Sequence, residues 1–319
     1  MSRMSSKIST GFARLVVAAC ISFPLLAQHY AVTTFSIPGA NGGMIGNGIN
    51  DQGDVTGSYG YIADKRTIER GFVRYADGSL LYPLIDPNDR SNFTAPYGIN
   101  NAGVIAGYYA GSQGYNGFLL ANGTYTDFQV FGSLNTQLLA INVSGDLAGA
   151  YGPITPTANG FVTVAGAPVQ VDIAGALYTH VTGLADDGSA VGFAQLDGQI
   201  VSFVRGPKGK VKIFQVPNAG PAGTVAQGIN SEAQLIVGYY YGATGGIFGF
   251  VYHYSKALNE LAPDAGGTKP AIERVDATTV NASAQSGYTF VQGVNSLGVI
   301  VGGWSSSKVS LGFIGTPIQ

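Results

Sequence analysis

The stretch GINNAGVIAGYYAGSQGYNGFL, residues 98–119, decides the fold, because the same phrase recurs along the chain. It contains a Gly-Ile-Asn strand end, a turn with glycine, a strand with glycine before an aromatic residue, a loop, and a strand that starts with Gly-Phe. The six copies have their first anchor residue at positions 48, 98, 140, 183, 228 and 293. Repeats of about 40 to 50 residues with four strands each are typical of β-propeller blades.

The six copies keep the phrase to different degrees. Copies two and five keep it best, copy three begins with Ala140, and copy four is the most altered, with Ala185 for Asn and Ser202 for Gly. The anchors of copies five and six are 65 residues apart, against 42 to 50 elsewhere. We interpret the excess, near residues 258–281, as an insertion that is too short for a further blade, although two strands hidden within it would give seven blades.

Each copy divides into four strands, A to D in chain order. Strand A ends at Gly-Ile-Asn, and the turn Asn50-Asp51-Gln52-Gly53 fits type I, with Asn first and Gly fourth. Strand B follows at 55–59, strand C begins at Gly-Phe, and a hairpin turn at Ala76-Asp77-Gly78 leads to strand D at 80–85. Because no stretch keeps an apolar period of 3.6 residues, we expect very little helix.

The two ends of the repeat region complement each other. Copy six ends after its strand C, whereas a spare strand precedes copy one: Phe35-Ser36-Ile37-Pro38 matches Phe214-Gln215-Val216-Pro217. We therefore expect residues 32–37 to pair with the strand near Phe313 and close the ring, which removes open strand edges. The sequence predicts an all-β, six-bladed propeller with four antiparallel strands per blade, in one domain over residues 28–319.

The first 27 residues have the pattern of a signal peptide. An apolar run at 15–27 is too short to span a bilayer, which takes about 20 residues. We expect cleavage after Ala27, with Ala31 as the second choice; Cys20 lies in a lipobox-like context and gives lipidation as an alternative. The leader predicts a secreted or periplasmic protein. Its basic residues are Arg3, Lys7 and Arg14.

Charge and composition exclude several classes of partner. The chain has 16 basic and 18 acidic residues, so removal of the three leader charges leaves 13 against 18, or −5. A protein of this charge has no basic face for nucleic acid or an anionic membrane. Cys20 is the only cysteine, so the mature chain forms no disulfide. No second long apolar segment predicts a membrane span, and we expect a monomer.

The Gly-Ile-Asn … Val-x-Gly-Tyr … Gly-Phe phrase resembles that of the bacterial HAF-type extracellular repeat family. The resemblance covers nearly all of residues 32–319 and is best in copies two and five. It implies export and repetition. It implies no agreed activity and no catalytic motif.

Common catalytic motifs, such as a P-loop, an HExxH helix or zinc-ligand spacing, are missing from the sequence. The residues directly before the anchors share one strand position and are mostly polar and uncharged. If they line the axial channel, they suit a ligand with hydroxyl or amide groups, because neutral amides and hydroxyls both donate and accept. Alternatively, they fill the channel with water and with each other. They are Asn47, Tyr97, Leu139, Thr182, Gln227 and Gln292.

His180 is the candidate catalytic residue. It lies just before strand A of copy four, in a loop that we expect to approach the central opening, and Asp86 is a candidate carboxylate partner. Without a fixed partner, a hydrogen-bonded structural histidine is the alternative. Two charged loops on this same end form a second candidate patch or a solvated surface. They contain Lys65, Arg66, Glu69 and Arg70, and Asp86, Asp89 and Arg90.

These observations favour a non-catalytic binding or scaffold propeller that recognises a glycan, peptide or surface protein through the end bearing the D–A and B–C loops. Tyrosines expected at loop tips, Tyr97, Tyr115 and Tyr178, could stack on sugars. The alternatives are an extracytoplasmic hydrolase or lyase using His180, and a surface module without a small ligand. No cofactor is predicted; acidic turn residues on the opposite end allow calcium but are also ordinary turn residues. They are Asp51, Asp54, Asp146, Asp186 and Asp187.

Overall fold

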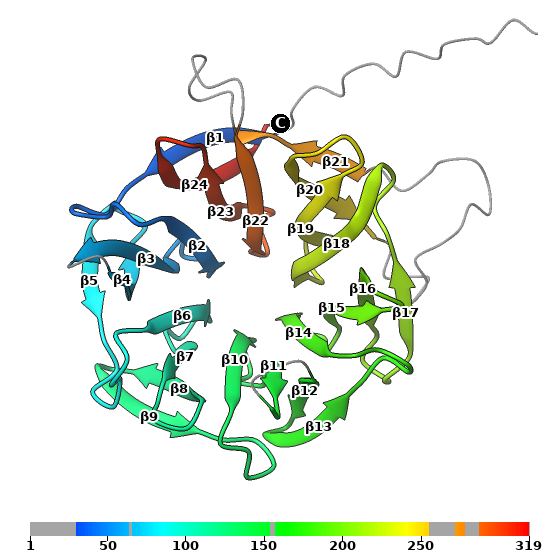
Figure 1. Cartoon of the computed structure of the whole chain (residues 1–319), viewed down its shortest axis with the longest axis horizontal. Coiled ribbons are helices and arrows are strands. Elements are labelled where there is room, and N and C mark those ends of the chain that lie inside the picture. The colour runs from blue at the N-terminus through cyan, green and yellow to red at the C-terminus, as the bar shows by residue number, and fades with distance from the viewer. Residues whose placement is uncertain (1–29, 64–65, 154–156, 255–271, 278–286, 319) are drawn as a thin grey trace, which may run out of the picture.

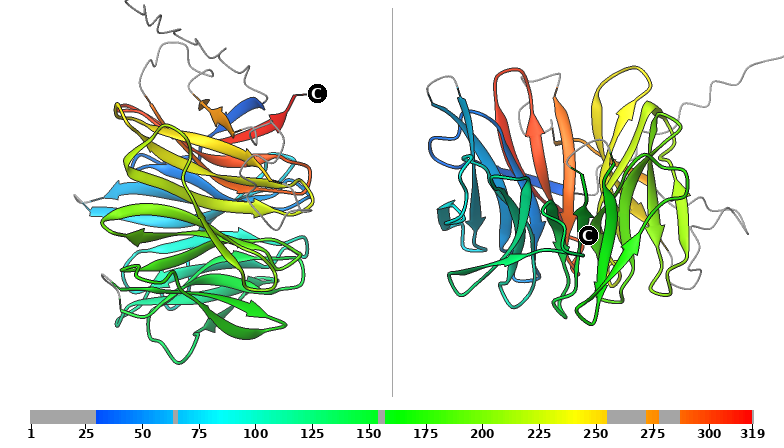
Figure 2. Two further views of the ribbon diagram at one scale, coloured as in Figure 1. Left: turned by 90° about the vertical axis from the view of Figure 1, so that its right-hand side faces the viewer. Right: turned by 60° about the horizontal axis from the view of Figure 1, so that its bottom comes forward.

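The computed structural model describes residues 30–63, 66–153, 157–254, 272–277 and 287–318. In this part of the chain the strands form six sheets of four antiparallel strands, which surround a central axis as blades (Figure 1). The described residues contain no α-helix. The protein is therefore a six-bladed β-propeller, as the repeat predicts, and Figure 2 shows the ring from the side with its loops at two ends.

Each blade contains its four strands in chain order from the channel outward, except the last. Blade one has β2 (Met44–Ile49), β3 (Val55–Ala63), β4 (Arg66–Arg74) and β5 (Leu80–Leu84). Blade two has β6 (Thr94–Ile99), β7 (Ile105–Ala110), β8 (Tyr115–Ala121) and β9 (Thr124–Phe128). Blade three has β10 (Thr136–Ile141), β11 (Leu147–Tyr151), β12 (Asn159–Val164) and β13 (Ala167–Val171).

The remaining blades follow the same order. Blade four has β14 (Thr179–Leu184), β15 (Ala190–Leu196), β16 (Gln199–Arg205) and β17 (Val211–Phe214). Blade five has β18 (Ala219–Asn230), β19 (Leu235–Gly242), β20 (Ile247–His253) and β21 (Ile272–Val275). Blade six has β22 (Tyr288–Val294), β23 (Ile300–Ser305), β24 (Ser310–Pro317) and, as its outer strand, β1 (Tyr30–Phe35).

Blade six combines the two ends of the described chain. β1 runs antiparallel to β24, with Phe35 opposite Gly312 and Thr34 opposite Phe313, and the two strands lie side by side in Figure 1. The predicted closure is confirmed, although the strand starts at Tyr30 and ends at Phe35. The ring is sealed by backbone hydrogen bonds between segments at opposite ends of the chain.

The predicted insertion at 258–281 is wrong in part. Residues 272–275 form β21, which pairs with β20 and is strand D of blade five. Residues 258–271 and 278–281 lie outside the described part of the chain. The short strand was missed because four residues give too little alternation to separate a strand from a loop.

Six pairs of residues explain why glycine precedes the aromatic residue in strand B and phenylalanine follows glycine in strand C. A Cβ on Gly57 would lie 2.6 Å from Phe72 Cζ and would overlap the Ile45 carbonyl oxygen. Every such phenylalanine is fully buried. The ring therefore occupies the space that a strand-B side chain would need. The pairs are Gly57–Phe72, Gly107–Phe118, Gly149–Phe161, Gly192–Phe203, Gly238–Phe250 and Gly302–Phe313.

A buried threonine near the start of strand A fixes the D–A loop in five blades. In blade two, Thr94 Oγ1 accepts a hydrogen bond from the Asp86 amide at 3.2 Å. The sequence analysis missed this repeat, although the threonine always stands four positions before the anchor. Blade one has Met44 in its place. The threonines are Thr94, Thr136, Thr179, Thr224 and Thr289.

Candidate functional site

The central channel is lined by the strand A of every blade, and each of these strands carries a β-bulge. In blade one the register shifts between Gly46 and Gly48, which leaves Asn47 without an opposite residue. A bulge re-aims the side chain of the extra residue. All six residues at this position line one cavity in the channel. The structure therefore brings together the six side chains that the sequence predicted to line the channel. The bulge residues are Asn47, Tyr97, Leu139, Thr182, Gln227 and Gln292.

The channel itself holds little space. An apolar belt, formed by the residues directly after the anchors, separates a cavity of about 80 Å³ beside the bulge residues from one of about 70 Å³ at the A–B turns. A water molecule needs roughly 10–15 Å³ by this measure, whereas small-molecule sites are about 300–1,000 Å³. These cavities fit a few waters. The belt contains Ile49, Ile99, Ile141, Leu184, Ile229 and Val294.

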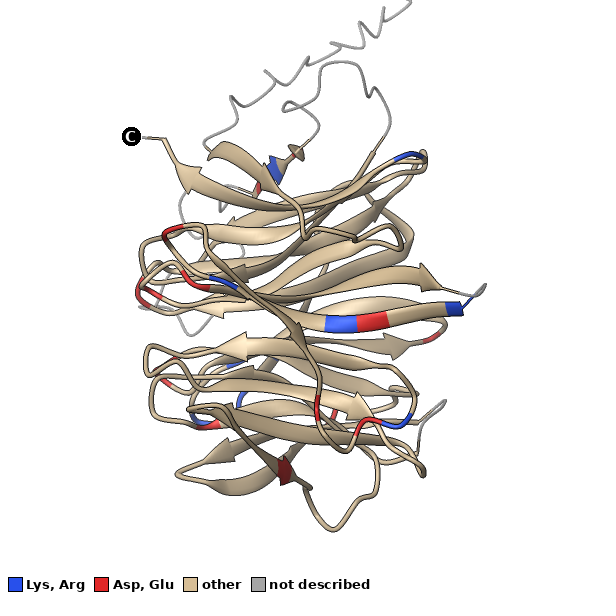
Figure 3. Cartoon of the chain, turned by 90° about the vertical axis from the view of Figure 1, so that its left-hand side faces the viewer, with Lys and Arg blue, Asp and Glu red and all other residues tan. Residues whose placement is uncertain are grey.

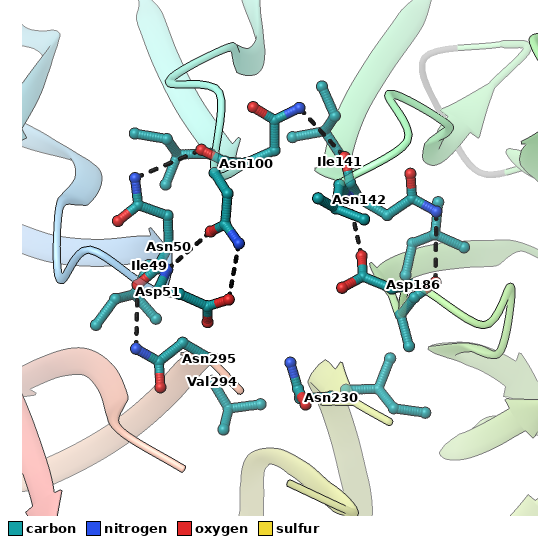
Figure 4. Close-up of a pocket in the computed structure, with 16 residues that line it drawn as sticks. Ile49, Asn50, Asp51, Asn100, Ile141, Asn142, Asp186, Asn230, Val294 and Asn295 are labelled. Atoms are coloured by element: carbon teal, nitrogen blue, oxygen red, sulfur yellow. Dashed lines mark hydrogen bonds between the residues drawn. The ribbon is translucent and has the colours of Figure 1, made fainter. Parts of the chain in front are cut away.

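One end of the channel, the asparagine end, carries the asparagines of the Gly-Ile-Asn phrase, shown in Figure 4. In blade two, Asn100 Oδ1 accepts the Val104 amide of its own turn at 3.0 Å, while Asn100 Nδ2 donates to the Asn142 carbonyl oxygen of the next blade at 3.2 Å. The amide of Asn100 thus fixes a turn and links two blades. Aspartate could not donate, which explains why the repeat uses asparagine.

Among the described residues, these inter-blade amide bonds do not form a closed circle around the channel. They link blades six, one, two, three and four in succession, and the bond from Asn295 to the Asn50 carbonyl oxygen, 3.0 Å, joins the two ends of the repeat region. Blade four has Ala185 and therefore no donor. Asn230 of blade five bonds only its own turn, to the amides of Glu232 and Ala233, among the described contacts.

The opposite end of the channel, at the D–A and B–C loops, carries aromatic rings. We call this the aromatic end, defined by ten side chains. In blade two, Tyr108 stacks on Phe93 and Tyr97 with centroids 5.6 and 5.3 Å apart. In blade five, Tyr239 contacts Phe290 of blade six at 5.0 Å. The ten are Phe93, Tyr97, Tyr108, Tyr115, Tyr178, His180, Phe193, Tyr239, Tyr241 and Phe290.

The expectation of exposed tyrosines at loop tips is wrong. Tyr97 belongs to β6, and Tyr97, Tyr115 and Tyr178 are all half-buried with their rings against other aromatic rings. The Tyr97 hydroxyl lies 3.4 Å from that of Tyr108, and burial raises the pKa of both phenols. The rings form a packed wall rather than free-standing platforms.

His180 lies in β14, not in a loop, and its ring stacks on Phe193 at 5.1 Å. Burial lowers the pKa of its imidazole to about 4, so it is neutral near pH 7. The described residues give its ring no hydrogen bond, and Asp86 is not beside it. The neighbour of the His180 ring is Phe193, which lies opposite it on the adjacent strand. This pairing depends on the strand register, which the sequence did not show.

Asp86 does lie in the D–A loop before β6, but it is only 1% exposed. One carboxylate oxygen accepts the Asn88 amide at 2.8 Å, and the other has no hydrogen-bond partner among the described residues. Burial raises the pKa of this carboxyl. Asp86 belongs to the connection between blades one and two, whereas His180 belongs to blade four, so the structure does not bring them together.

The two charged loops do meet, as predicted, but not as a surface patch. Arg70 forms an ion pair with Asp89 at 3.3 Å, with side chains 9% and 1% exposed. Arg70 also donates to Asn92 at 2.7 Å, and Asp89 accepts the Thr94 hydroxyl at 2.9 Å. This buried network connects blades one and two. Elsewhere charged residues are sparse, as Figure 3 shows for one side of the ring.

The acidic turn residues accept hydrogen bonds from the protein. Asp51 accepts the Asn101 amide group at 2.7 Å and the Ser296 backbone amide at 2.9 Å, so hydrogen bonding holds the pKa of its carboxyl below the usual value. Asp186 accepts the Val143 amide at 2.9 Å. The described residues contain no group of three or more His, Cys, Asp or Glu side chains placed to hold a metal.

Glu69 of β4 is a site residue that the sequence analysis placed only in a charged loop. It lines a cavity of about 270 Å³ between blades one and six, beside the aromatic end. Ser58 donates a hydrogen bond to its carboxylate, and burial raises the pKa. The signal in the sequence was weak, because Glu69 stands in a hairpin that also carries Lys65, Arg66 and Arg70.

Comparisons with known proteins concern the fold. No family model and no curated protein matches the chain. A catalytically inactive virginiamycin B lyase from Staphylococcus aureus with quinupristin is 9% identical over 89% of this chain and 99% of that chain, with a TM-score of 0.46. TolB from Acinetobacter baumannii is 10% identical over 68% of this chain and 53% of that chain, TM-score 0.47.

A variant of AofleA from Arthrobotrys oligospora is 13% identical over 88% of both chains, with a TM-score of 0.45. At these identities and TM-scores the likeness says nothing about the activity of this chain. Among the described residues, no helix is long and apolar enough to cross a membrane.

Proposed function

We propose that this protein is an exported, non-catalytic propeller that binds a glycan at the aromatic end. The observation that supports this most is the concentration of ten aromatic rings at one end of the channel, beside neutral hydroxyl and amide groups. Sugar rings present apolar faces that stack on aromatic side chains, and hydroxyls that pair with neutral donors and acceptors.

The chemistry of this end favours a glycan over the other two partner classes. A peptide or surface protein of ordinary composition would call for charged or large apolar contacts, whereas the bulge residues here are four polar uncharged side chains with Tyr97 and Leu139. Tyr239, whose hydroxyl is bonded to Gln227, shows how phenols and amides act together at this position. Burial raises the Tyr239 pKa, so the phenol stays protonated and can donate.

The hydrolase or lyase alternative loses its geometric support. General acid–base catalysis needs a titratable group with a partner or substrate in reach. His180 is neutral and stacked, Glu69 accepts a hydrogen bond from Ser58, and Asp89 is paired with Arg70.

Export and membership of the HAF-type repeat family remain part of the proposal. Cleavage after Ala27 leaves β1 whole, whereas cleavage after Ala31 would remove Tyr30, which is 6% exposed and packs in the core of blade six. The strand that closes the ring thus supports Ala27. N-terminal sequencing of the exported protein should begin at Gln28.

The binding proposal is tested with a glycan array and two matched tyrosine variants. Tyr178→Ala removes a half-buried ring of the aromatic end, and Tyr75→Ala removes a 40% exposed ring from a C–D turn at the asparagine end. We expect Tyr178→Ala to weaken binding of the array hit about tenfold, as loss of roughly 1.4 kcal/mol would. Tyr75→Ala should change nothing. Equal losses in both variants, or an array without any hit, would contradict the proposal.

A further inference from the structure

The repeat pattern breaks where blade six meets blade one. Five blades start strand A with a buried threonine, but blade one has Met44. Its backbone amide instead donates to Ser310 Oγ of blade six at 3.1 Å, and Ser310 Oγ donates to the Met44 carbonyl oxygen at 3.3 Å. The 270 Å³ cavity lies at this irregular junction.

Glycines create the space and backbone hydrogen bonds hold its walls. The cavity is lined by Gly42, Gly43, Gly60 and Gly303, which have no side chains to fill it. The Gly42 amide donates to the Gly60 carbonyl oxygen at 2.9 Å, and the Gly60 amide donates to that of Gly43 at 2.8 Å. The segment before β2 is therefore fastened to the tip of β3, and the cavity is preformed.

One charged side chain of the described residues lines this cavity. Among the described residues that line the cavity, Glu69 is the one with a charged side chain, and the others present hydroxyl, aromatic and aliphatic groups. Its neighbour in sequence, Arg70, is engaged by Asp89 and Asn92 on its own side of the strand. Among the described contacts, the Glu69 carboxylate accepts a hydrogen bond from the Ser58 hydroxyl and is paired with no cation. Glu69 is half-buried, and a carboxylate that is partly removed from water gains from a cation placed beside it.

Two aromatic side chains line the cavity together with the carboxylate. Phe290 and Tyr59 line the same cavity. The backbone of Glu69 pairs with Phe93, a ring of the aromatic end, and its amide donates to the Asn92 carbonyl oxygen at 3.0 Å. A carboxylate with hydroxyls and aromatic rings around it is the environment that suits an ammonium group, which has three donors, one positive charge and an attraction to ring faces.

We propose that this cavity binds a protonated primary amine, carried by an amino-sugar unit of the glycan. The inference rests on the proposed function, because the cavity opens beside the aromatic end, sharing Phe290 with it. The ammonium pairs with Glu69, its remaining N–H groups reach the hydroxyls of Ser58, Ser305 or Ser310, and the sugar ring extends toward the aromatic end. A neutral N-acetyl group gains none of the charge pairing.

The test compares a glucosamine tetramer with its fully N-acetylated counterpart by calorimetry at about pH 6.5, where most of the amines carry a proton. We expect the wild type to bind the free amine about tenfold more tightly, and Glu69→Gln to bind the two tetramers equally. Asp77→Asn, which neutralises an exposed carboxylate in a C–D turn, is the matched control and should keep the preference. A preference that survives in Glu69→Gln overturns the inference.

A second measurement separates failure of the pocket from failure of the glycan proposal. Methylammonium chloride is titrated into the protein while the backbone amide signals of Ser58, Gly60 and Thr67 are followed by NMR. Saturable shifts that vanish in Glu69→Gln support the amine pocket even if no glycan binds at the aromatic end. If these shifts do not appear in the wild type, the pocket is wrong, whereas array hits that depend on Tyr178 would keep the proposed function.

Discussion

The two ends of the channel are built on opposite principles. At the asparagine end, one residue type recurs in five of six blades, and its amide groups bond to the protein itself. At the aromatic end, equivalent positions carry different side chains: Ala95 stands opposite Tyr108, Gln137 opposite Ala150, and His180 opposite Phe193. The repeated residues hold the blades together, and the varied residues are free to form a site.

This difference teaches where to look for function in a repeat protein. A residue that recurs in each repeat has the same neighbours in every blade, so its explanation lies in the blade or in the contact between blades. A ligand has no sixfold symmetry, so its site must come from the positions where the copies differ. The Glu69 cavity follows this rule, because it lies where Met44 replaces the repeated threonine.

The sharpest way to break the comparison is to change a repeated glycine that packs against a buried phenylalanine. Gly57→Ala would push a Cβ into Phe72 and the Ile45 carbonyl oxygen. We expect a loss of about 3 kcal/mol or more in the free energy of unfolding, because neither the buried ring nor the backbone can move away. Thermal and denaturant unfolding measure it.

Gly46→Ala is the control for this variant, since Gly46 is opposite Gly57 in the same hairpin. The nearest atom to a Cβ there is Val55 Cγ1 at 3.2 Å, a contact that a small side-chain shift relieves. We expect a cost below about 1 kcal/mol. Equal losses in the two variants would mean that overlap with Phe72 is not the reason for the glycine.

The pH dependence of stability should come in part from the aromatic end. The His180 pKa is about 4 in the folded protein and about 6.5 when unfolded, so the unfolded state takes up the proton first as the pH falls. This contribution is complete above about pH 6.5 and is lost toward pH 4. Relative to His180→Phe, which keeps the stacking on Phe193, we expect the wild type to lose roughly 2–3 kcal/mol across that window.

Denaturant unfolding of both proteins between pH 7 and 4 measures this difference, and the carboxylates that titrate in the same window cancel between them. Parallel stability curves for the wild type and His180→Phe would show that the imidazole is not desolvated in the folded state.

An intermediate effect is expected from the inter-blade amide bond of Asn100. Asn100→Ala removes two turn bonds and the bond to the Asn142 carbonyl oxygen, and should cost about 1–2 kcal/mol. Asn230→Ala is matched to it, because Asn230 makes the turn bonds without an inter-blade bond. The difference between the two variants in urea unfolding, about 1 kcal/mol, measures the link between blades. Identical losses would assign the whole effect to the turn.

The smallest predicted effect repairs the gap at blade four. Ala185→Asn supplies the missing donor toward the carbonyl oxygen of residue 230, the acceptor equivalent to those used by the other blades. We expect a gain of about 0.5–1 kcal/mol in the free energy of unfolding and unchanged glycan binding. A loss of stability in Ala185→Asn would show that blades four and five pack differently from the others.

Much of the site could be anticipated from the sequence, and the rest shows the limits of that approach. The bulge residues were predicted to share the channel because they hold one repeat position, and the structure places all six there. The rings opposite the residues two positions before the bulges, such as Phe193 opposite His180, were missed because cross-strand neighbours depend on register. The threonine four residues before each anchor was visible in the sequence and was overlooked.

The sequence by itself determined the number of blades, the four-strand unit and the closure of the ring, because hairpins are local and a missing fourth strand at one end has its complement at the other. Only the tertiary structure decided what each position does. Whether Asn100 reaches a carbonyl oxygen 42 residues away, and whether Glu69 finds a cation or a cavity, depends on the spacing between blades. Backbone acceptors and empty space are set by the packed ring and leave no mark in the order of the side chains.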